Sequence, residues 1–275
     1  MIKNYYKYEN LVFLCGGHDF HAIDWYRRAL ENLDNINIFI LTDLIKCESF
    51  KVLIKENDIV FKLIILDKFL FSKQSSFGNY WRHLVKFLVL PFQIYLIKKF
   101  SKLHPKSIFY AHSMYYIWLA RFAGIEYVGR PQGSDILIKP FKSRIFKILT
   151  RQAINKSKAI IVDSNLMYKN IKRFANNDKV CVIPNGIDLN NIQKLMESKE
   201  NKNNRKSIIS IRGFTELYRI HEILLSRSVS EKSLKIPIKF IYPFYDANYK
   251  KSLEKLFLSK DQDIFRLKKI DMYKT

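Results

Sequence analysis

Short runs of β-branched and aromatic residues alternate with longer stretches of helical periodicity, and this alternation limits the fold more than any other feature of the chain. The expected strands are Asn10–Cys15, Ile36–Leu41, Val60–Leu66, Ser107–Ala111, Glu126–Val128, Ala159–Val162 and Lys179–Ile183. The expected helices are Ala22–Leu33, Tyr80–Leu103, Ser113–Phe122, Lys142–Lys156 and Asn165–Phe174, the last with Asp163-Ser164 as its N-cap. Strands separated by helices favour a parallel sheet covered by those helices. The pattern therefore predicts an α/β fold.

The pattern of apolar and polar residues changes near residue 190. Residues 197–206 read ESKENKNNRK, a polar run without apolar periodicity that is typical of a linker. A second set follows, with expected strands Ser207–Ile211 and Ile236–Tyr242, expected helices Glu216–Arg227 and Ala247–Leu258, and a weak segment to Thr275. We expect one domain over residues 1–190, a linker over 191–206 and a second unit over 207–275. The second unit is shorter than the roughly 100 residues of a usual doubly wound domain, so we expect it to be incomplete.

Lys and Arg number 48 against 25 Asp and Glu, a formal net charge of +23. Such an excess favours polyanions, but it has three interpretations. The first is compositional, because Lys, Ile and Asn are frequent throughout. The second is attraction to an anionic membrane surface. The third, dedicated nucleic-acid binding, is the weakest, because the sequence has no zinc-finger spacing, RNP-like motif or basic zipper.

Apolar residues make up 48% of the chain and aromatic residues 15%, which excludes a disordered chain. Cys15, Cys47 and Cys181 form no CxxC pair and no even disulfide set, as expected in a reducing compartment. The most apolar stretch, Phe87–Ile97, is interrupted by Pro91 and is too short to span a bilayer. We therefore expect a cytoplasmic protein that binds no metal.

Two motifs follow expected strands of the first domain. Gly16-Gly17 comes after the first strand, where paired glycines let the backbone approach a ligand; a tight turn between strand and helix is the structural alternative. His112 comes at the carboxyl end of another strand, where an imidazole could relay protons. Its structural alternative is a histidine that caps the next helix or is hydrogen-bonded in the core.

Three further motifs also stand at strand ends. Residues 130–135 read RPQGSD, in which Gly133 permits an unusual backbone angle and Asp135 would project into the same rim; a β-turn is the alternative. Pro184-Asn185-Gly186 predicts a strand-to-helix or interdomain turn. Arg212 ends the first strand of the second unit, where a guanidinium would suit a diphosphate unless it is an ordinary surface arginine.

Taken together, these motifs resemble the family 4 (group 1) retaining glycosyltransferases. The segments that carry the resemblance are SIFYAHSMYYIWLARFAGIEYVGRPQGSDIL (107–137), SKAIIVDSNLMYKNIKRFANNDKVCVIPNGIDL (157–189) and SIISIRGFTELYRIHEILLSR (207–227). Gln132 stands where the family usually has His. The resemblance implies a GT-B-like fold, with one complete Rossmann-like N-terminal domain that binds acceptor and a second, incomplete Rossmann-like domain that binds donor. It implies transfer of a sugar from a nucleotide-sugar donor with retention of configuration and without a metal ion.

The resemblance also implies roles for single residues. His112 and Asp135 would lie near the reacting sugar as catalytic residues. The donor phosphates would be bound by Gly16, Gly17, Arg212 and Arg219, although Tyr218 competes with Arg219 for its place. The acceptor would be bound by His18, Gln132 and Ser134.

One difference from the family leads to two interpretations of the function. The E-x7-E motif that holds the donor sugar and ribose in the family is absent after Arg212, which suggests a truncated donor domain. The first interpretation is a retaining glycosyltransferase in cell-surface polysaccharide or glycolipid assembly, with a saccharide or lipid-linked acceptor. The alternative is a non-catalytic remnant or acceptor-binding module. The apolar stripe of Tyr80–Leu103 is favoured as a core helix, with docking at an anionic inner membrane face as its alternative.

Overall fold

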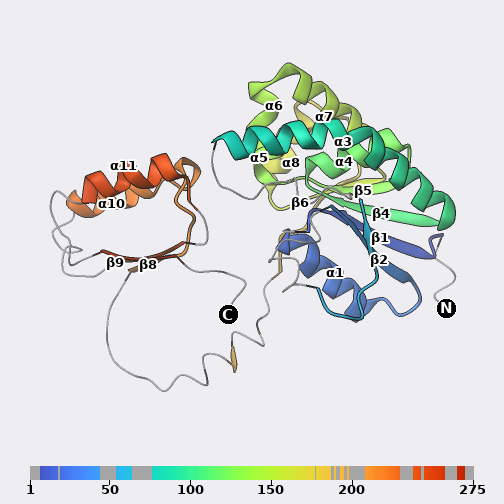
Figure 1. Cartoon of the computed structure of the whole chain (residues 1–275), viewed down its shortest axis with the longest axis horizontal. Coiled ribbons are helices and arrows are strands. Elements are labelled where there is room, and N and C mark those ends of the chain that lie inside the picture. The colour runs from blue at the N-terminus through green and yellow to red at the C-terminus, as the bar shows by residue number, and fades with distance from the viewer. Residues whose placement is uncertain are drawn as a thin grey trace. The chain divides into compact units, whose positions relative to one another are not determined.

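The structure of the chain is a computed structural model (Figure 1). It describes residues 7–17, 19–43, 54–63, 76–176, 178–186, 189, 193–194, 197, 208–229, 238–242, 245–257 and 265–269. The chain forms two compact units. Unit 1 is Met1–Phe71 with His83–Ile187, and unit 2 is Ser72–Arg82 with Asp188–Thr275. Of the expected linker 191–206, all but residues 193, 194 and 197 lie outside the described residues.

Unit 1 is built on a seven-stranded sheet whose strands all pair in parallel. The strands are β1 (Asn10–Cys15), β2 (Asn37–Thr42), β3 (Val60–Lys62), β4 (Ser107–His112), β5 (Tyr127–Arg130), β6 (Ala159–Val162) and β7 (Val180–Val182). Their spatial order is β3-β2-β1-β4-β5-β6-β7. The order reverses beside β1, which is the switch point where α/β sheets bind ligands. The expected parallel α/β sheet is confirmed.

Helices cover both faces of this sheet. They are α1 (Phe20–Asn32), α3 (Ser76–Leu103), α4 (Met114–Ala123), α5 (Gly133–Leu137), α6 (Lys139–Lys142), α7 (Arg144–Lys156) and α8 (Asn165–Lys172). Helix α1 lies on one face, and α3, α4 and α7 lie on the other (Figure 1). The predicted Ser164 N-cap of α8 is present, since its side chain accepts a hydrogen bond from Met167 N at 3.4 Å.

The strand sequences explain the two layers. Successive side chains of a strand point to opposite faces. In β1, Val12 and Leu14 pack with α3 and α4, while Phe13 and Cys15 pack with α1. A strand buried on both faces must be apolar at every position, and the run LVFLC satisfies this requirement.

Helix α3 is divided lengthwise between core and surface. Val85, Ile97 and Phe100 are buried, whereas Phe87 is 73% exposed and Leu88 is 66% exposed. The favoured core assignment therefore holds for one face of the helix only. None of the described helices combines the length and the hydrophobicity needed to span a membrane.

Helix α5 begins within residues 130–135, for which a β-turn was the structural alternative, and α6 follows it. Gln132 is the N-cap of α5, and its side chain and that of Asp135 form a reciprocal capping box. Short helices of four or five residues have no apolar period, so sequence patterns cannot reveal them.

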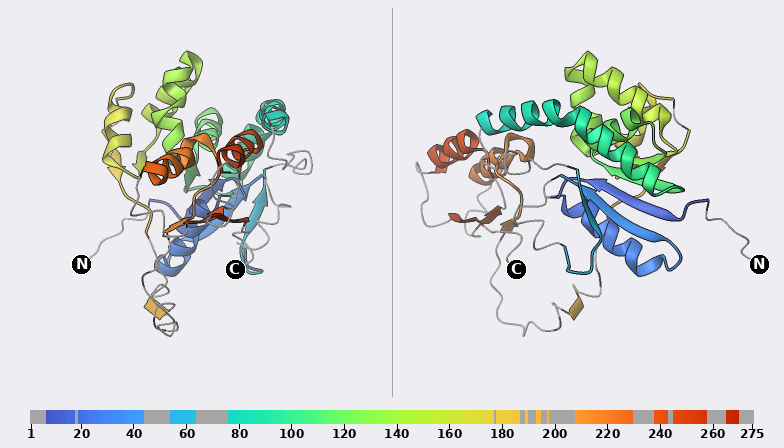
Figure 2. Two further views of the ribbon diagram at one scale, coloured as in Figure 1. Left: turned by 90° about the vertical axis from the view of Figure 1, so that its left-hand side faces the viewer. Right: turned by 45° about the vertical axis from the view of Figure 1, so that its right-hand side comes forward.

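Unit 2 contains a three-stranded parallel sheet in the order β10-β9-β8. Its elements are β8 (Ile208–Ser210), the 3-10 turn η2 (Glu216–Tyr218), α10 (Ile220–Val229), β9 (Ile238–Tyr242), α11 (Ala247–Phe257) and β10 (Phe265–Lys269). Helices α10 and α11 lie on the same face of this sheet (Figure 2). The expected helix Glu216–Arg227 is interrupted at Arg219, whose φ of 51° is left-handed. The expected weak segment before Thr275 contains the strand β10.

Gly129 in β5 leaves no room for a side chain, because Ile160 of β6 and Ile117 of α4 pack against it. A Cβ atom there would lie 2.8 Å from Cδ1 of Ile160 and 3.1 Å from Cδ1 of Ile117. We predict that Gly129→Val lowers the free energy of unfolding by about 1–3 kcal/mol through overpacking, measured by urea denaturation. The control Gly186→Val, at a position with no atom within 4 Å of the added Cβ, should change it by less than about 0.5 kcal/mol. Equal effects of the two variants would contradict the close packing.

Candidate functional site

The carboxyl ends of β1, β4 and β5 bring three motifs of the sequence to one edge of the unit 1 sheet. In the register of the sheet, Leu14 pairs with Ala111, and His112 pairs with Arg130. The turn after β1, the end of β4 and the loop after β5 are therefore neighbours. This is the edge at which open α/β sheets bind their ligands.

The turn after β1 is short because a backbone hydrogen bond closes it. Asp19 N donates to Gly16 O at 2.9 Å, and Gly16 and Gly17 are both buried. Asp19 is the N-cap of α1, and its Oδ1 accepts from Ala22 N at 3.4 Å. His18 lies outside the described residues.

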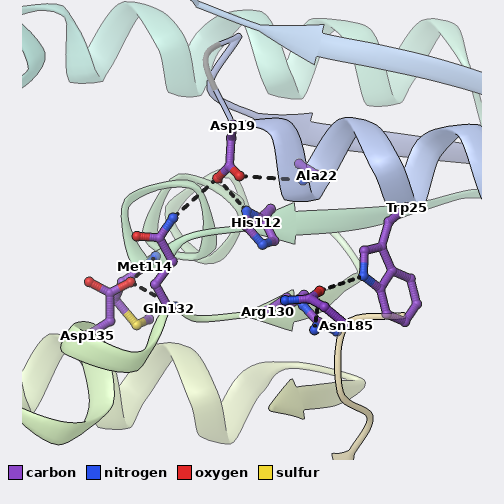
Figure 3. A network of polar contacts seen from close by, with 9 residues as sticks. All are labelled: Asp19, Ala22, Trp25, His112, Met114, Arg130, Gln132, Asp135 and Asn185. Carbon is purple, nitrogen blue, oxygen red and sulfur yellow. Dashed lines mark hydrogen bonds and ion pairs between the residues drawn. The ribbon is translucent and has the colours of Figure 1, made fainter. Parts of the chain in front are cut away.

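The centre of the site is a hydrogen bond between two buried side chains. His112 Nδ1 lies 2.5 Å from Asp19 Oδ2, and both residues are at most 8% exposed (Figure 3). A carboxylate can only accept, so Nδ1 carries the proton. His112 Nε2 has no hydrogen-bond partner among the residues that the structure describes. The pairing thus fixes the tautomer and leaves a nitrogen acceptor for a ligand.

Gln132 joins the same carboxylate from the loop after β5. Its Nε2 donates to Asp19 Oδ2 at 3.4 Å, so Gln132 and His112 share one oxygen (Figure 3). Gln132 is exposed, which leaves its amide accessible to a ligand. We define Asp19, His112 and Gln132 as the dyad cluster.

Asp135 uses its carboxylate within the protein. Its Oδ2 accepts from Met114 N at 3.0 Å and from Gln132 N at 3.1 Å, and its Oδ1 pairs with Lys139 Nζ at 2.7 Å (Figure 3). The side chain is 3% exposed. Asp135 therefore fastens the loop that carries Gln132 to the start of α4. Ser134, half-buried, lies in the first turn of α5 beside it.

Arg130 ties the far side of the same edge together. It is 1% exposed, forms an ion pair with Asp163, and donates to Asn185 Oδ1 at 2.9 Å. Its guanidinium lies 4.6 Å from the ring centre of Trp25, whose Nε1 also donates to Asn185 Oδ1, at 3.2 Å. The Pro184-Asn185-Gly186 turn is thus held against α1 and β5.

Burial and negative charge set the electrostatics of this edge. Burial, with smaller contributions from the carboxylates of Asp19 and Asp43, raises the pKa of the Cys15 thiol well above its usual value. Burial lowers the pKa of His21. Cys15 is therefore an inert thiol rather than a nucleophile. Among the described residues, no group of His, Cys, Asp and Glu side chains could hold a metal ion.

Comparison with known families gives one match in this region. Residues 76–191 match the family model described as Glycosyltransferase Family 4. The resemblance predicted from the sequence is thereby confirmed for a region that includes His112, Gln132 and Asp135, whereas Asp19 precedes it. A comparison with curated protein sequences gave no match.

Several solved structures share the fold of this chain. Anabaena HepE in complex with UDP and glucose is 12% identical, with a TM-score of 0.61 over 96% of this chain and 70% of HepE. Sucrose-phosphate synthase from Thermosynechococcus elongatus is 10% identical, with a TM-score of 0.65 over 96% of this chain and 71% of its own. UDP-GlcNAc 2-epimerase from Neisseria meningitidis, bound to UDP-GlcNAc, is 12% identical, with a TM-score of 0.55 over 95% of this chain and 72% of its own. The expected GT-B-like fold is confirmed.

The two arginines predicted to bind donor lie in unit 2. Arg212 is exposed, and its guanidinium lies 5.7 Å from the ring centre of Tyr218. Arg219 is also exposed and pairs with Glu222. Both therefore have charged heads near solvent, as a phosphate-binding residue needs.

Sequence reasoning placed Gly16, Gly17, His112 and Gln132 correctly at one edge but did not single out Asp19. The residue was visible as the fifth member of the sequence CGGHD. A carboxylate that follows a glycine turn and precedes a helix is a common N-cap. Its second role, as the partner of a histidine 93 residues away, requires the strand order and could not be found locally.

Asp19 has two structural roles, so its removal should be costly. We predict that Asp19→Ala lowers the free energy of unfolding by about 1–3 kcal/mol, because α1 loses its cap and the buried His112 Nδ1 loses its partner. The matched control is Asp24→Ala, at an exposed position of the same helix, which should change it by less than about 0.5 kcal/mol.

Urea denaturation measures both variants, and ¹⁵N chemical shifts of the His112 imidazole report its tautomer. The Nδ1–H form should dominate in the unaltered chain and lose its preference in Asp19→Ala. Equal stabilities of the two variants, or an Nε2–H form in the unaltered chain, would contradict the hydrogen bond between Asp19 and His112.

Proposed function

We propose that the chain is a glycosyltransferase that moves a sugar from a nucleotide-sugar donor to a saccharide or lipid-linked acceptor with retention of configuration. The observation that carries this proposal is the dyad cluster, at the carboxyl edge of a sheet within and beside the Glycosyltransferase Family 4 segment. Nucleotide-sugar binding is supported by relatives of the same fold, since HepE forms a complex with UDP-glucose.

The reaction makes defined demands on the site. The bond between the anomeric carbon and the diphosphate oxygen breaks, and a bond from that carbon to the acceptor oxygen forms on the same face. The acceptor hydroxyl releases its proton to the departing phosphate oxygen. Negative charge therefore builds up on the diphosphate, and fixed cations or backbone N–H groups stabilise it. No metal ion is required.

Different residues of the proposed site would meet each of these requirements. In unit 2, Arg212 and Arg219 supply exposed cationic groups suited to a diphosphate. In unit 1, the Gly16-Gly17 turn brings the backbone to the edge of the sheet at which ligands bind. His112, fixed by Asp19, presents Nε2 to a hydroxyl of the reacting sugar. Gln132, with Ser134 and His18, binds the acceptor. Asp135 acts here as a positioning residue, because its carboxylate is engaged with Met114, Gln132 and Lys139.

The fold alone does not select this reaction, since UDP-GlcNAc 2-epimerases share it. The family match favours glycosyl transfer. The alternative function is a non-catalytic acceptor-binding module. Affinity for a nucleotide-sugar separates the two, because only the enzyme needs a donor site.

The surface of α3 supports action at an anionic membrane, with cell-surface polysaccharide assembly as the setting. Phe87, Leu88 and Tyr95 are exposed, and Lys98 and Lys99 follow in the next turn. Aromatic and aliphatic side chains can enter the interfacial region, while each lysine near anionic headgroups contributes about 1 kcal/mol. The net charge of +23 adds long-range attraction.

The proposed activity is tested by a transfer assay on the full chain with a panel of UDP- and GDP-sugars. We predict that His112→Ala lowers turnover at least about 10²-fold without unfolding the protein. Arg212→Ala should weaken nucleotide binding about tenfold, whereas Arg151→Ala, an exposed arginine of α7, should leave it unchanged. Full activity of both site variants would remove the assigned roles. A chain that binds no nucleotide-sugar would favour the acceptor-binding module.

Membrane docking makes a separate prediction. The double variant Phe87→Ser with Leu88→Ser should bind vesicles containing 30% phosphatidylglycerol at least about tenfold more weakly than the unaltered chain, since burying one such side chain contributes about 1.5–3 kcal/mol. Leu166→Ser, at an exposed position of α8, is the control. Vesicle co-sedimentation measures the binding. Equal binding to neutral vesicles, or no effect of the double variant, would contradict docking through α3.

A further inference from the structure

The segment that forms α6 and α7 carries only positive charge. Residues 136–162 contain seven Lys and Arg and no Asp or Glu. Two of the seven are paired, Lys139 with Asp135 and Lys158 with Glu126. The other five are exposed and form no ion pair with any acidic residue that the structure describes; they are Lys142, Arg144, Lys147, Arg151 and Lys156. Their charge is therefore directed to solvent and not to the protein.

Helix α7 has two sides of opposite character. Thr150, Ala153 and Ile154 are buried against the rest of unit 1. On the solvent side, Ile145 is 73% exposed and Ile148 is 55% exposed. Their spacing of three positions makes them neighbours on the helix surface. The solvent side of α7 therefore carries a small apolar ridge that contributes little to the core.

Cations border this ridge. Arg144 lies four positions before Ile148, and Arg151 lies three positions after it, so both side chains are neighbours of Ile148 on the helix. Phe141, in α6 immediately before α7, is also exposed, at 48%. We call Arg144, Ile145, Ile148 and Arg151 the α7 surface.

One kind of partner accounts for both features of the α7 surface. Isoleucine side chains gain free energy on leaving water, whereas cations gain most from an anionic partner. An anionic bilayer offers phosphates at its surface and acyl chains directly below them. Arginine side chains can keep their charged heads at the level of the phosphates while apolar neighbours enter more deeply.

We propose that the α7 surface docks unit 1 on an anionic membrane, with Ile145 and Ile148 at the acyl boundary and the two arginines on lipid phosphates. The inference deepens the proposed function and rests on its membrane setting, to which it adds a contact separate from that of α3. The helix lies in the plane of the membrane, because its opposite side is buried in the protein.

Other macromolecules match only part of the α7 surface. A nucleic acid would pair with the arginines but would leave the apolar ridge in water. A protein partner would have to supply an acidic group for each unpaired cation of the segment, and lysine is depleted in protein interfaces. A lipid surface satisfies the ridge and the cations together.

The α7 surface and α3 lie on one side of unit 1. Ile97 and Phe100 of α3 and Ala153 of α7 belong to one core cluster, on the face of the sheet away from α1. The solvent sides of the two helices therefore both turn away from the sheet on that face (Figure 1). Two contacts with one membrane bind more tightly than either alone, because the second contact forms within an already bound protein.

Vesicle co-sedimentation of the full chain tests the proposal, with vesicles that contain 30% phosphatidylglycerol. We predict that Ile145→Ser with Ile148→Ser weakens binding at least about tenfold. Ile145→Leu with Ile148→Leu keeps the apolar ridge and should bind within about twofold of the unaltered chain. The matched control is Leu30→Ser with Ile59→Ser, two exposed apolar positions beside each other near α1, which should have no effect. Because all four positions are exposed, the variants should fold, as circular dichroism can verify.

A second pair of variants tests the role of the cations. Arg144→Gln with Arg151→Gln should weaken vesicle binding at least about fivefold, since each cation near anionic headgroups strengthens the attraction. The control Lys55→Gln with Lys62→Gln removes the same net charge at exposed positions elsewhere in unit 1 and should change binding by less than about twofold. Equal effects of the two pairs would show that binding follows net charge alone and would overturn the proposal.

Three other results would also overturn it. The first is unchanged vesicle binding in the isoleucine-to-serine variant. The second is a lipid-free dimer, seen by sedimentation velocity, that this variant abolishes, because the ridge would then be a protein interface. The third is binding of a DNA duplex that the arginine variant abolishes while its vesicle binding stays intact, because the cations would then serve a nucleic acid.

Parallel measurements separate the α7 surface from α3 and from the proposed activity. Loss of vesicle binding in the α7 variants, but not in Phe87→Ser with Leu88→Ser, would support docking through α7 and remove the contact through α3. The α7 variants should retain transfer to a water-soluble acceptor, because none of the altered residues belongs to the dyad cluster. Vesicle binding through α7 in a chain without transfer activity would support the surface and remove the transferase. Transfer activity in a chain whose vesicle binding ignores the α7 variants would do the reverse.

Discussion

The parallel pairing of all seven strands in unit 1 is the constraint from which the site follows. Because every strand runs in one direction, every strand ends at the same edge, and residues far apart in sequence meet there. Asp19 and His112 are separated by 93 positions and lie 2.5 Å apart at their polar atoms. An antiparallel sheet of the same residues would have placed them at opposite ends. The chemistry of the edge is thus a consequence of topology.

That edge is also where the molecule tolerates costly burial of charge. Asp19 shares one oxygen with His112 and Gln132, and Asp135 fastens the loop that carries Gln132. Asp43, which is also fully buried, lies 3.5 Å from the ammonium of Lys86. Both buried carboxylates are thus held by groups of the protein.

The fold was largely predictable from sequence because strands buried on both faces contain continuous apolar runs, such as Leu11–Cys15 in β1. The predicted β1 and β6 have the observed bounds, and others differ by one or a few residues. The short helices α5 and α6 were missed, since five residues carry no period. At the site, His112 and Gln132 stood out as polar residues at strand ends, but the role of Asp19 required the spatial order of β1 and β4. The division of α3 between core and surface was likewise invisible, because both faces of the helix are apolar.

Arg130 and Trp25 anchor Asn185 near the point where the chain leaves unit 1. Asn185 is bonded to a buried guanidinium and to the indole of Trp25, and the boundary between the units lies at residues 187 and 188. One amide oxygen thus holds the Pro184-Asn185-Gly186 turn to two elements at once. A ligand that shifts either α1 or β5 would therefore also shift this turn.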